Sequence, residues 1–171
     1  MNTIDNIMTR TSVRRFTDQP ISEEDIKTIL KAGMSGPSCV NARDWYFVAV
    51  TDKKVLNKMA DANGGPAAPL RSAALGVLVC GDLERAFERA PEYWVIDGAI
   101  AGQNMILAAH DLGIGSVWLG TWPQMNRVQA QSKLFDLPET LEPHSIIAFG
   151  YPAENPPVKG PEWEEDRVRF I

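Results

Sequence analysis

The sequence predicts an α+β fold, in which helices pack on a central sheet. Two apolar, β-branched runs read as strands, several segments repeat apolar residues at helical spacing, and the two kinds of element do not alternate regularly along the chain. A doubly wound parallel sheet would require that alternation, so it is disfavoured. With 171 residues, the chain is expected to form one domain spanning residues 1–171.

The first third of the chain predicts two helices. Apolar residues recur at helical spacing in residues 4–8, and this short helix should break in the basic stretch 11–19. Ser22 is a favoured N-cap residue, and the three acidic residues after it suit the first turn of a second helix. That helix should end near residues 33–36, where glycines are followed by Pro37.

The middle of the chain predicts two strands separated by a helix. Residues 45–50 are aromatic and β-branched, residues 73–80 read as a buried strand, and Asp52 opens the helix between them. The Asn-Gly-Gly-Pro sequence at 63–66 is a strong breaker and should form a mobile loop. The charged and aromatic residues 82–94 are interpreted as a helical or loop excursion that could serve as a lid.

The longest helical pattern, residues 93–112, is apolar nearly all round. A helix of this kind is buried on every face, and in a chain this small a second subunit is a natural cover. Short strands are expected at 116–119 and 145–149, with a helix at 123–135 whose first turn begins with proline. The proline-rich tail, about 151–171, should be extended.

Composition excludes several classes of function. The chain has 22 acidic and 17 basic residues and a net charge of −5, so it is not expected to bind nucleic acid or anionic membranes. Its two cysteines, Cys39 and Cys80, form no paired framework, which argues against a zinc site or disulfide scaffold and favours a cytoplasmic setting. No apolar run approaches the ~18 residues of a membrane span, and the first ten residues lack the apolar core of a signal peptide.

Common catalytic motifs do not occur in the sequence. The Gly-Ile-Gly at 113–115 follows a helical pattern rather than a strand, and Trp118 stands where a dinucleotide fingerprint has its third glycine. There is no P-loop, HExxH or GxSxG pattern. His110 and His144 lack the carboxylate spacing of a metal site and are interpreted as structural or surface residues. An enzyme with so few catalytic side chains is expected to use a cofactor.

Two polar stretches are candidates for binding that cofactor. Residues 10–16 gather guanidinium and hydroxyl groups that can bind a phosphate monoester, and a solvated basic turn is the alternative. Residues 36–41 offer a rigid turn with a hydroxyl and an amide, which suits the edge of a flavin or another heteroaromatic ring. An ordinary turn with a local Asx-type bond is the alternative there.

These stretches belong to a series of motifs whose order and approximate spacing extend from residue 8 to about 160. The matched positions are Arg10, Ser12, Arg14 and Phe16; Pro37, Ser38, Asn41 and Trp45; residues 103–116; Trp118, Leu119 and Gly120; and residues 149–152. Through this series the chain resembles the nitroreductase family of flavoproteins.

The resemblance implies a mostly antiparallel sheet flanked by helices, an intertwined homodimer, and two FMN sites in its interface. One subunit would contribute Arg10 at the phosphate, Arg14 at the N1/O2 side of the flavin, and the neighbouring Thr11 and Ser12. The partner would border the ring with Pro37, Ser38, Cys39 and Asn41. Leu119 and Gly120 would present backbone amides near flavin N5, and Lys159 would be a further phosphate ligand, with Arg167 and Arg169 as alternatives.

Two departures from the family pattern bear on the site. Arg43 and Asp44 stand where the family often has Gln-Pro, so this wall of the site is expected to be more polar or bridged by a salt link. Residues 64–69 lack the amide or lysine that many members carry before the second strand, so one usual FMN contact is expected to be missing. Cys39 is interpreted as a small buried filler rather than a reactive thiol.

The activity implied by the resemblance is hydride transfer from NAD(P)H through flavin N5 to an electron-poor acceptor, such as a nitroaromatic or a quinone, by a ping-pong mechanism. No acid or base side chain is expected to be essential. Two alternatives remain open: an FMN-binding protein for storage or sensing, and a reductive dehalogenase on the same fold. The dehalogenase is disfavoured because no lysine lies between residues 59 and 132.

Overall fold

The computed structural model describes residues 1–154, 157 and 160–171. Four strands form one antiparallel sheet in the order β1-β2-β4-β3. Their bounds are Trp45–Val50 (β1), Leu75–Asp82 (β2), Gly115–Gly120 (β3) and Leu141–Gly150 (β4). All four predicted strands are present, and the mixture of helices with an antiparallel sheet confirms the predicted α+β class.

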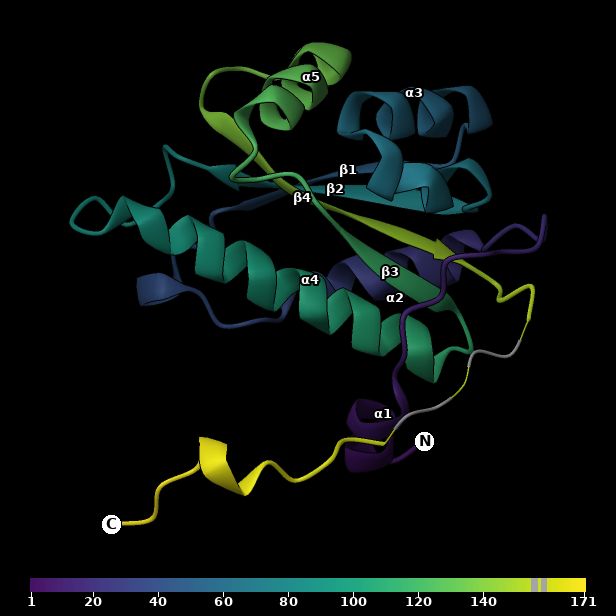
Figure 1. Ribbon diagram of the computed structural model, residues 1–171. Helices are drawn as coiled ribbons and strands as arrows, with labels where there is room; N and C mark the ends of the chain where they lie inside the picture. The colour runs from purple at the N-terminus through teal and green to yellow at the C-terminus, as the bar shows by residue number, and fades with distance from the viewer. Residues whose placement is uncertain (155–156, 158–159) are drawn as a thin grey trace.

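Helices cover both faces of the sheet and give a three-layer arrangement (Figure 1). One face carries α3 and α5, the other carries α2 and α4, and α1 lies beside the C-terminal end of α4. The α-helices are Thr3–Thr9 (α1), Glu23–Met34 (α2), Lys53–Asn63 (α3), Trp94–Asp111 (α4) and Met125–Phe135 (α5). Short 3-10 turns are Cys39–Asn41 (η1), Gly65–Arg71 (η2), Pro91–Tyr93 (η3) and Glu165–Arg167 (η4).

The central position of β2 and β4 in the sheet explains why their apolar residues do not alternate with polar ones. Side chains of β2 and β4 point alternately to the two faces, and each face is covered by helices, so both sets are buried. Leu78 and Ile146 belong to the core on the α3 and α5 side, whereas Val77 and Ile147 belong to the core on the α2 and α4 side. Register therefore places an apolar layer on each side of the sheet.

Helix caps follow the sequence closely. Ser22 accepts a hydrogen bond from the Asp25 N–H at the start of α2, and Asp52 accepts from the Lys54 and Val55 N–H groups at the start of α3. Both caps are predicted from the sequence, and they fix where each helix begins. The last helix, α5, begins two residues after the predicted proline.

One local prediction is wrong. The breaker at 63–66 is not a loop, because α3 continues through Asn63, the chain turns at Gly64 with φ of 82°, and η2 follows at once. Within the single chain, α4 leaves one face uncovered, since Ile96 is 51% exposed, and burial of this face by a second subunit stays a prediction. Both observations bear on the candidate site, because Asn63 contacts the end of β3 and Ile96 lies on the uncovered face of α4.

Among the described residues, no helix combines the length and apolar character needed to cross a bilayer. The described part of the tail beyond Tyr151 is extended apart from η4, as predicted, and it projects past α1 away from the sheet (Figure 1).

Candidate functional site

The basic N-terminal segment, residues 10–16, runs along the outer edge of β3. The Val13 N–H donates to the Ser116 carbonyl at 2.9 Å, and Ser12 and Ser116 form a parallel bridge. Phe16 forms an antiparallel bridge with Pro152, so the segment lies between the edge of the sheet and the chain that leaves β4. Backbone bonds therefore position the basic side chains of this segment.

Two glycines allow this close approach. A Cβ on Gly115 would lie 2.8 Å from the Cβ of Val13, and a Cβ on Gly150 would lie 2.8 Å from the Cβ of Phe16. Any larger residue would therefore displace the segment. Val13 and Phe16 are buried and belong to the core beneath α3 and α5.

The segment presents its polar groups to two neighbouring hollows. Arg10 and Ser12 line a hollow of about 340 Å³. Its remaining walls are Gln103, Ile106, Ser116, Val117 and Trp118. Thr11 lines a second hollow of about 350 Å³, which Arg10 also borders. Arg14 points outward and is exposed. Three of the four predicted residues of this segment thus line hollows beside β3, and Arg14 does not.

The outer edge of β3 carries free backbone positions next to the first hollow. Residues of an antiparallel strand alternate between facing one neighbour and the other. Ser116 bonds to the N-terminal segment, so Trp118 and Gly120 share this outward direction, whereas Leu119 faces β4. Gly120 is exposed, with no atom within 4 Å of where a Cβ would be. A planar ligand can therefore approach this backbone closely.

A buried amide fixes the end of β3, and the sequence reasoning missed it. Asn63 is 1% exposed, and its Nδ2 donates to the Gly120 carbonyl at 3.1 Å. Its Oδ1 accepts from the Thr121 hydroxyl at 2.9 Å, and Arg127 donates to the same Gly120 carbonyl. Residues 64–69 carry no amide, as the sequence indicates, and the Asn63 amide just before them is committed to Gly120 and Thr121. Its place at the end of the α3 pattern was the available signal.

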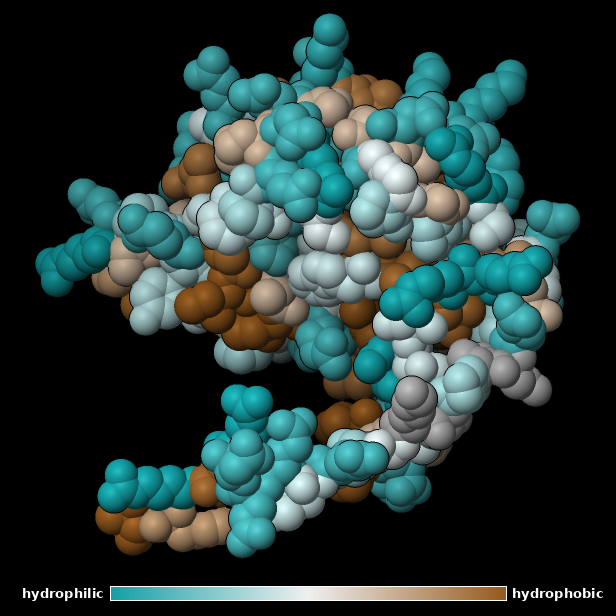
Figure 2. All heavy atoms as spheres, in the orientation of Figure 1, coloured by the Kyte–Doolittle hydropathy of each residue, from teal (hydrophilic) through white to brown (hydrophobic). Residues whose placement is uncertain are grey.

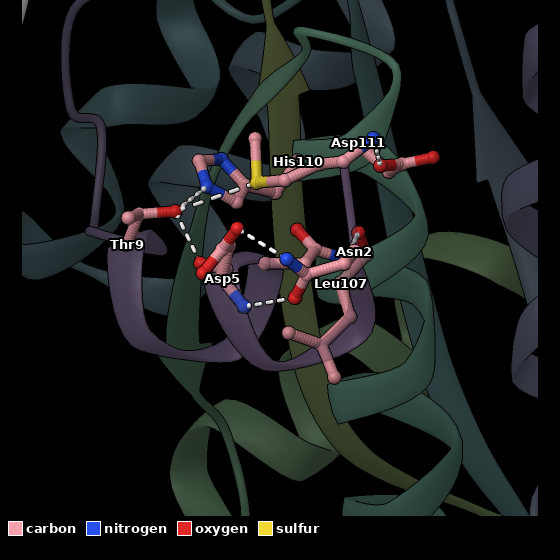
Figure 3. A network of polar contacts seen from close by, with 8 residues as sticks. Asn2, Asp5, Thr9, Leu107, His110 and Asp111 are labelled. Atoms are coloured by element: carbon pink, nitrogen blue, oxygen red, sulfur yellow. Dashed lines mark hydrogen bonds and ion pairs between the residues drawn. The ribbon is translucent and has the colours of Figure 1, made fainter.

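Figure 3 shows the contacts that hold α1 against the C-terminal end of α4. These contacts fix the position of Arg10, which directly follows α1. The Thr9 hydroxyl lies 3.0 Å from His110 Nε2, and the N-terminal amine pairs with Asp111 at 3.1 Å. Burial, and next the positive charge of Arg10, lower the pKa of His110. His110 thus has a structural contact beside the arginine.

His144 is buried between aromatic rings and is also structural. It makes edge contacts with Trp94 and Trp118, and its Nδ1 lies 3.1 Å from the Ser145 hydroxyl. Burial lowers the pKa of His144 to about 4, so the ring is neutral at physiological pH. Among the described residues, no group of three potential ligands could hold a metal ion.

The second predicted stretch, residues 36–41, belongs to a loop over residues 36–43 (the 36–43 loop), which lies on the N-terminal half of α4. The Cys39 N–H donates to the Asp97 carboxylate, at 2.9 Å to Oδ2 and 3.1 Å to Oδ1. The Arg43 N–H donates to the Ser38 hydroxyl at 2.9 Å. Pro37 and Asn41 are exposed, and Cys39 is half-buried rather than fully buried as expected.

The salt link predicted for Arg43 and Asp44 does not form. The Arg43 guanidinium lies over the Trp45 ring, 5.9 Å from its centroid. Asp44 is buried, and neither of its carboxylate oxygens has a hydrogen-bond partner. Arg43 lines an open hollow on the β1 side, so this wall has one cation facing outward and one acid facing inward.

Within one chain, the two halves of the predicted site stay apart. The 36–43 loop lies against α4 from Asp97 through Ile100 to Asn104. The hollow beside Arg10 reaches α4 at Gln103 and Ile106. Asp97 and Ile106 are about 14 Å apart along the helix axis. None of the loop residues lines the hollow that contains Arg10 and Ser12. Lys159 lies outside the described residues, and Arg167 pairs with Glu164 and Asp166.

Comparison with known proteins identifies the family. The model of the nitroreductase family matches residues 7–79 and 65–151. The chain belongs to the nitroreductase family. A protein of Methanothermobacter thermautotrophicus that is provisionally named NADH dehydrogenase/NAD(P)H nitroreductase is 42% identical over 170 residues, which are 99% of this chain and 87% of that protein.

Solved structures of this family superpose on the chain. An FMN-dependent nitroreductase from Clostridium difficile is 26% identical with a TM-score of 0.90, and the match covers 98% of each chain. The NADPH:FMN oxidoreductase of Vibrio harveyi, solved with NAD+, is 30% identical with a TM-score of 0.87 over 99% of this chain and 77% of that one. These likenesses confirm the predicted family, fold and oxidoreductase class, and they agree with the predicted FMN cofactor.

Proposed function

We propose that this protein binds FMN between two identical chains and uses it to pass hydride from NAD(P)H to a small electron-poor acceptor. The observation that carries the proposal is the outer edge of β3. There Arg10 and Ser12 line one hollow together with Ser116 and Trp118, and the uncovered Gly120 follows on the same strand. Relatives named for FMN and NADPH support the choice of cofactor and reductant.

The residues around this hollow fit a flavin mononucleotide. Arg10 and Ser12 supply a cation and a hydroxyl for the phosphate, in a chain whose net charge is otherwise negative. The backbone of Trp118 and Gly120 offers donors along an edge that no side chain covers at Gly120. The cofactor would thus be held by its charge at one end and by backbone groups along its ring.

A second copy of the chain would complete the site. Figure 2 shows apolar side chains gathered over the N-terminal half of α4. They surround a shallow hollow of about 460 Å³ lined by Val95, Ile96, Ala99, Ile100, Gln103 and Asn104. Exposed apolar residues also lie on α1 and on the tail: Ile4, Ile7, Met8, Trp163, Phe170 and Ile171. Apolar surface of this extent indicates an interface, and burying it would bring the partner's 36–43 loop to the ring.

The protein's own groups would position the reactants and adjust the charge at the site. FMN would supply the transfer of hydride between NAD(P)H and the acceptor. Arg14 would stabilise negative charge on the reduced ring once the partner covers it. Gly120 leaves the backbone uncovered where the ring would approach, and Asn63 holds Gly120 in place. A ping-pong order follows if both substrates use the same face in turn.

Proton transfer by a side chain is not required in this scheme. In the hollow beside Arg10 the described polar side chains are Arg10, Ser12, Gln103 and Ser116, none of which is a general base at neutral pH. Relatives and solved structures named as NADPH-flavin oxidoreductases favour turnover over storage.

Spectroscopy and rapid mixing test the proposal. Purified protein should carry FMN absorption at one FMN per chain, and mixing with NADH or NADPH should bleach it before any acceptor is added. Menadione or nitrofurazone should then restore the colour. A protein that binds FMN but is bleached by neither nucleotide would exclude the reductase and leave the storage role.

Ile96→Glu tests the interface independently of the chemistry. A carboxylate on the apolar face of α4 opposes its burial against a second copy. Light scattering should show a dimer for the natural chain and a monomer for the variant, with FMN lost in parallel. Glu88→Gln, an exposed change before α4, is the control. A monomer that still binds FMN with unchanged affinity would contradict the shared site.

A further inference from the structure

The 36–43 loop is tied to α4 by one buried acid. The Cys39 N–H donates to both oxygens of Asp97, and Asp97 is 2% exposed. Asp97 lies in the first turn of α4, where the helix dipole stabilises negative charge. The Cys39 amide and the start of α4 together fix the position of the Asp97 carboxylate.

The backbone of this loop is strained and therefore needs an anchor. Val40, Asn41 and Arg43 have positive φ values of 46°, 58° and 53°. For a β-branched residue such as Val40 this region is a genuine outlier, and such conformations persist only where the surroundings hold them. Backbone bonds from Asn41 to Ser38 and from Ala42 to Cys39 close the turn, and Arg43 bonds to the Ser38 hydroxyl. The bond of Cys39 to Asp97 ties the turn to α4.

A second buried acid interacts with the first. Asp44 is 1% exposed, its carboxylate oxygens have no hydrogen-bond partner among the described residues, and the negative charge of Asp97 acts on it. An ionised carboxylate without a donor is costly inside a protein. A protonated Asp44 removes this cost, because its O–H can donate to the Asp97 carboxylate.

We propose that Asp97 is a positioning residue for the flavin-bordering loop and that Asp44 supports it by sharing one proton with it. The expected effect on FMN binding rests on the proposed function, because the loop matters to FMN only if a partner's flavin lies against it. The acid pair itself belongs to each chain alone.

The surroundings favour a shared proton. Burial, followed by the charge of Asp97, raises the pKa of Asp44 from 3.8 to about 6. Asp82, at the end of β2, acts in the same direction. From β4, His144 packs against Gly98 and is neutral at physiological pH, and Glu142 adds a negative charge that acts on Cys80.

Among the described residues, the charges that act on Asp44 are those of Asp97 and Asp82, and both are negative. The α2 side contacts α4 through Gly33 and Gly36, and the guanidinium of Arg43 is turned over Trp45. As pH rises, Asp44 loses its proton and two carboxylates face each other in a buried place. Repulsion should then loosen the anchor of Cys39 and weaken FMN binding.

The first experiment measures FMN affinity by fluorescence quenching from pH 5 to pH 8. Asp97→Ala should raise the Kd roughly tenfold at pH 5.5, which corresponds to one lost charge-assisted hydrogen bond. Asp44→Asn keeps a permanent donor for Asp97 and should bind FMN with nearly constant strength. The ratio of the natural chain's Kd to that of Asp44→Asn should rise as pH passes 6. The FMN phosphate and His110 are common to both measurements, so the effect of their titration on the Kd cancels in this ratio.

Asp136→Asn is the matched control. Asp136 is an exposed acid in the left-handed cap of α5, a conformation that asparagine also tolerates. It should follow the natural chain at every pH. If Asp97→Ala changes FMN affinity no more than Asp136→Asn, Asp97 does not position the loop. If Asp97→Ala does not fold, the pH dependence of the Kd ratio between the natural chain and Asp44→Asn still tests the proposal.

The second experiment needs no flavin. The chain has two cysteines, so labelling with 15N-cysteine gives one backbone signal from the loop and one from β2 as an internal reference. The Cys39 signal should shift with pH in the natural chain and stay constant in Asp44→Asn, while the Cys80 signal moves in neither.

The two experiments separate the two proposals. A Cys39 signal that does not titrate, or titrates equally in both proteins, would overturn the acid pair even if FMN binds. A protein that ignores FMN but shows the expected Cys39 titration would overturn the proposed function and leave the acid pair standing.

Discussion

The N-terminal segment and the 36–43 loop are held in place by different kinds of contact. The first is held by backbone bonds to β3 and by Val13 and Phe16, which pack against glycines in the sheet. The second is held by side chains, with the Cys39 amide on a buried carboxylate and a backbone in the left-handed region.

This difference predicts how each half of the site should respond to pH and to substitution. Backbone pairing does not depend on the protonation of side chains, so the position of the N-terminal segment should be insensitive to pH near neutrality and sensitive to the size of residues 115 and 150. The loop should be the reverse, because its anchor is an acid beside another acid. Substitutions that separate these responses test the comparison.

The largest effect is expected at the phosphate end. Arg10→Ala should raise the Kd for FMN roughly a hundredfold, because a charge-assisted pair with phosphate is lost. Riboflavin, which has no phosphate, should bind the variant and the natural chain alike. Arg15→Ala, which removes only an exposed pair with Glu154, is the control. Equal losses for FMN and riboflavin would place the phosphate elsewhere.

The next effect concerns the backbone fastening. Gly115→Ala places a Cβ 2.8 Å from the Val13 Cβ, which should cost about 2 kcal/mol of unfolding free energy as an overpacked contact. Urea unfolding without FMN measures it. Gly65→Ala is the matched control, because no atom lies within 4 Å of its Cβ position. If the two variants are equally stable, the segment is not held by this packing.

A smaller effect is expected where α3 meets the end of β3. Asn63→Ala removes both side-chain bonds, to the Gly120 carbonyl and from the Thr121 hydroxyl, and should cost about 1–2 kcal/mol. Asn57→Ala, on the same helix, should cost less. Unfolding free energies of both variants provide the test. A change in FMN affinity for Asn63→Ala alone would tie this amide to the position of Gly120.

The sequence predicted the parts of this molecule that depend on local patterns. Strand positions, helix starts at Ser22 and Asp52, and the order of the family motifs follow from periodicity, capping and turn residues. Arg10 and Ser12 could be predicted as a pair because they lie two residues apart and the structure keeps them on one hollow.

What the sequence did not predict depends on contacts between distant residues. Asn63 reads as part of a breaker, and only the packing of α3 against β3 reveals its contact with Gly120. Asp44 reads as half of a salt link with its neighbour, because nothing local indicates that Asp97 lies beside it, 53 positions along the chain. The uncovered face of α4 is likewise invisible in an apolar pattern that predicts burial all round.

The smallest effect tests the loop through stability alone. The pKa of Asp44 is raised to about 6 in the folded chain, so between pH 5 and pH 7 the folded state releases a proton that the unfolded state has already lost. The natural chain should therefore lose about 1 kcal/mol of stability relative to Asp44→Asn over this interval. Urea unfolding at the two pH values gives the difference, and His144 cancels because both proteins contain it. A difference of the opposite sign would mean that Asp44 is stabilised as an anion, and the loop would then be anchored as independently of pH as the N-terminal segment.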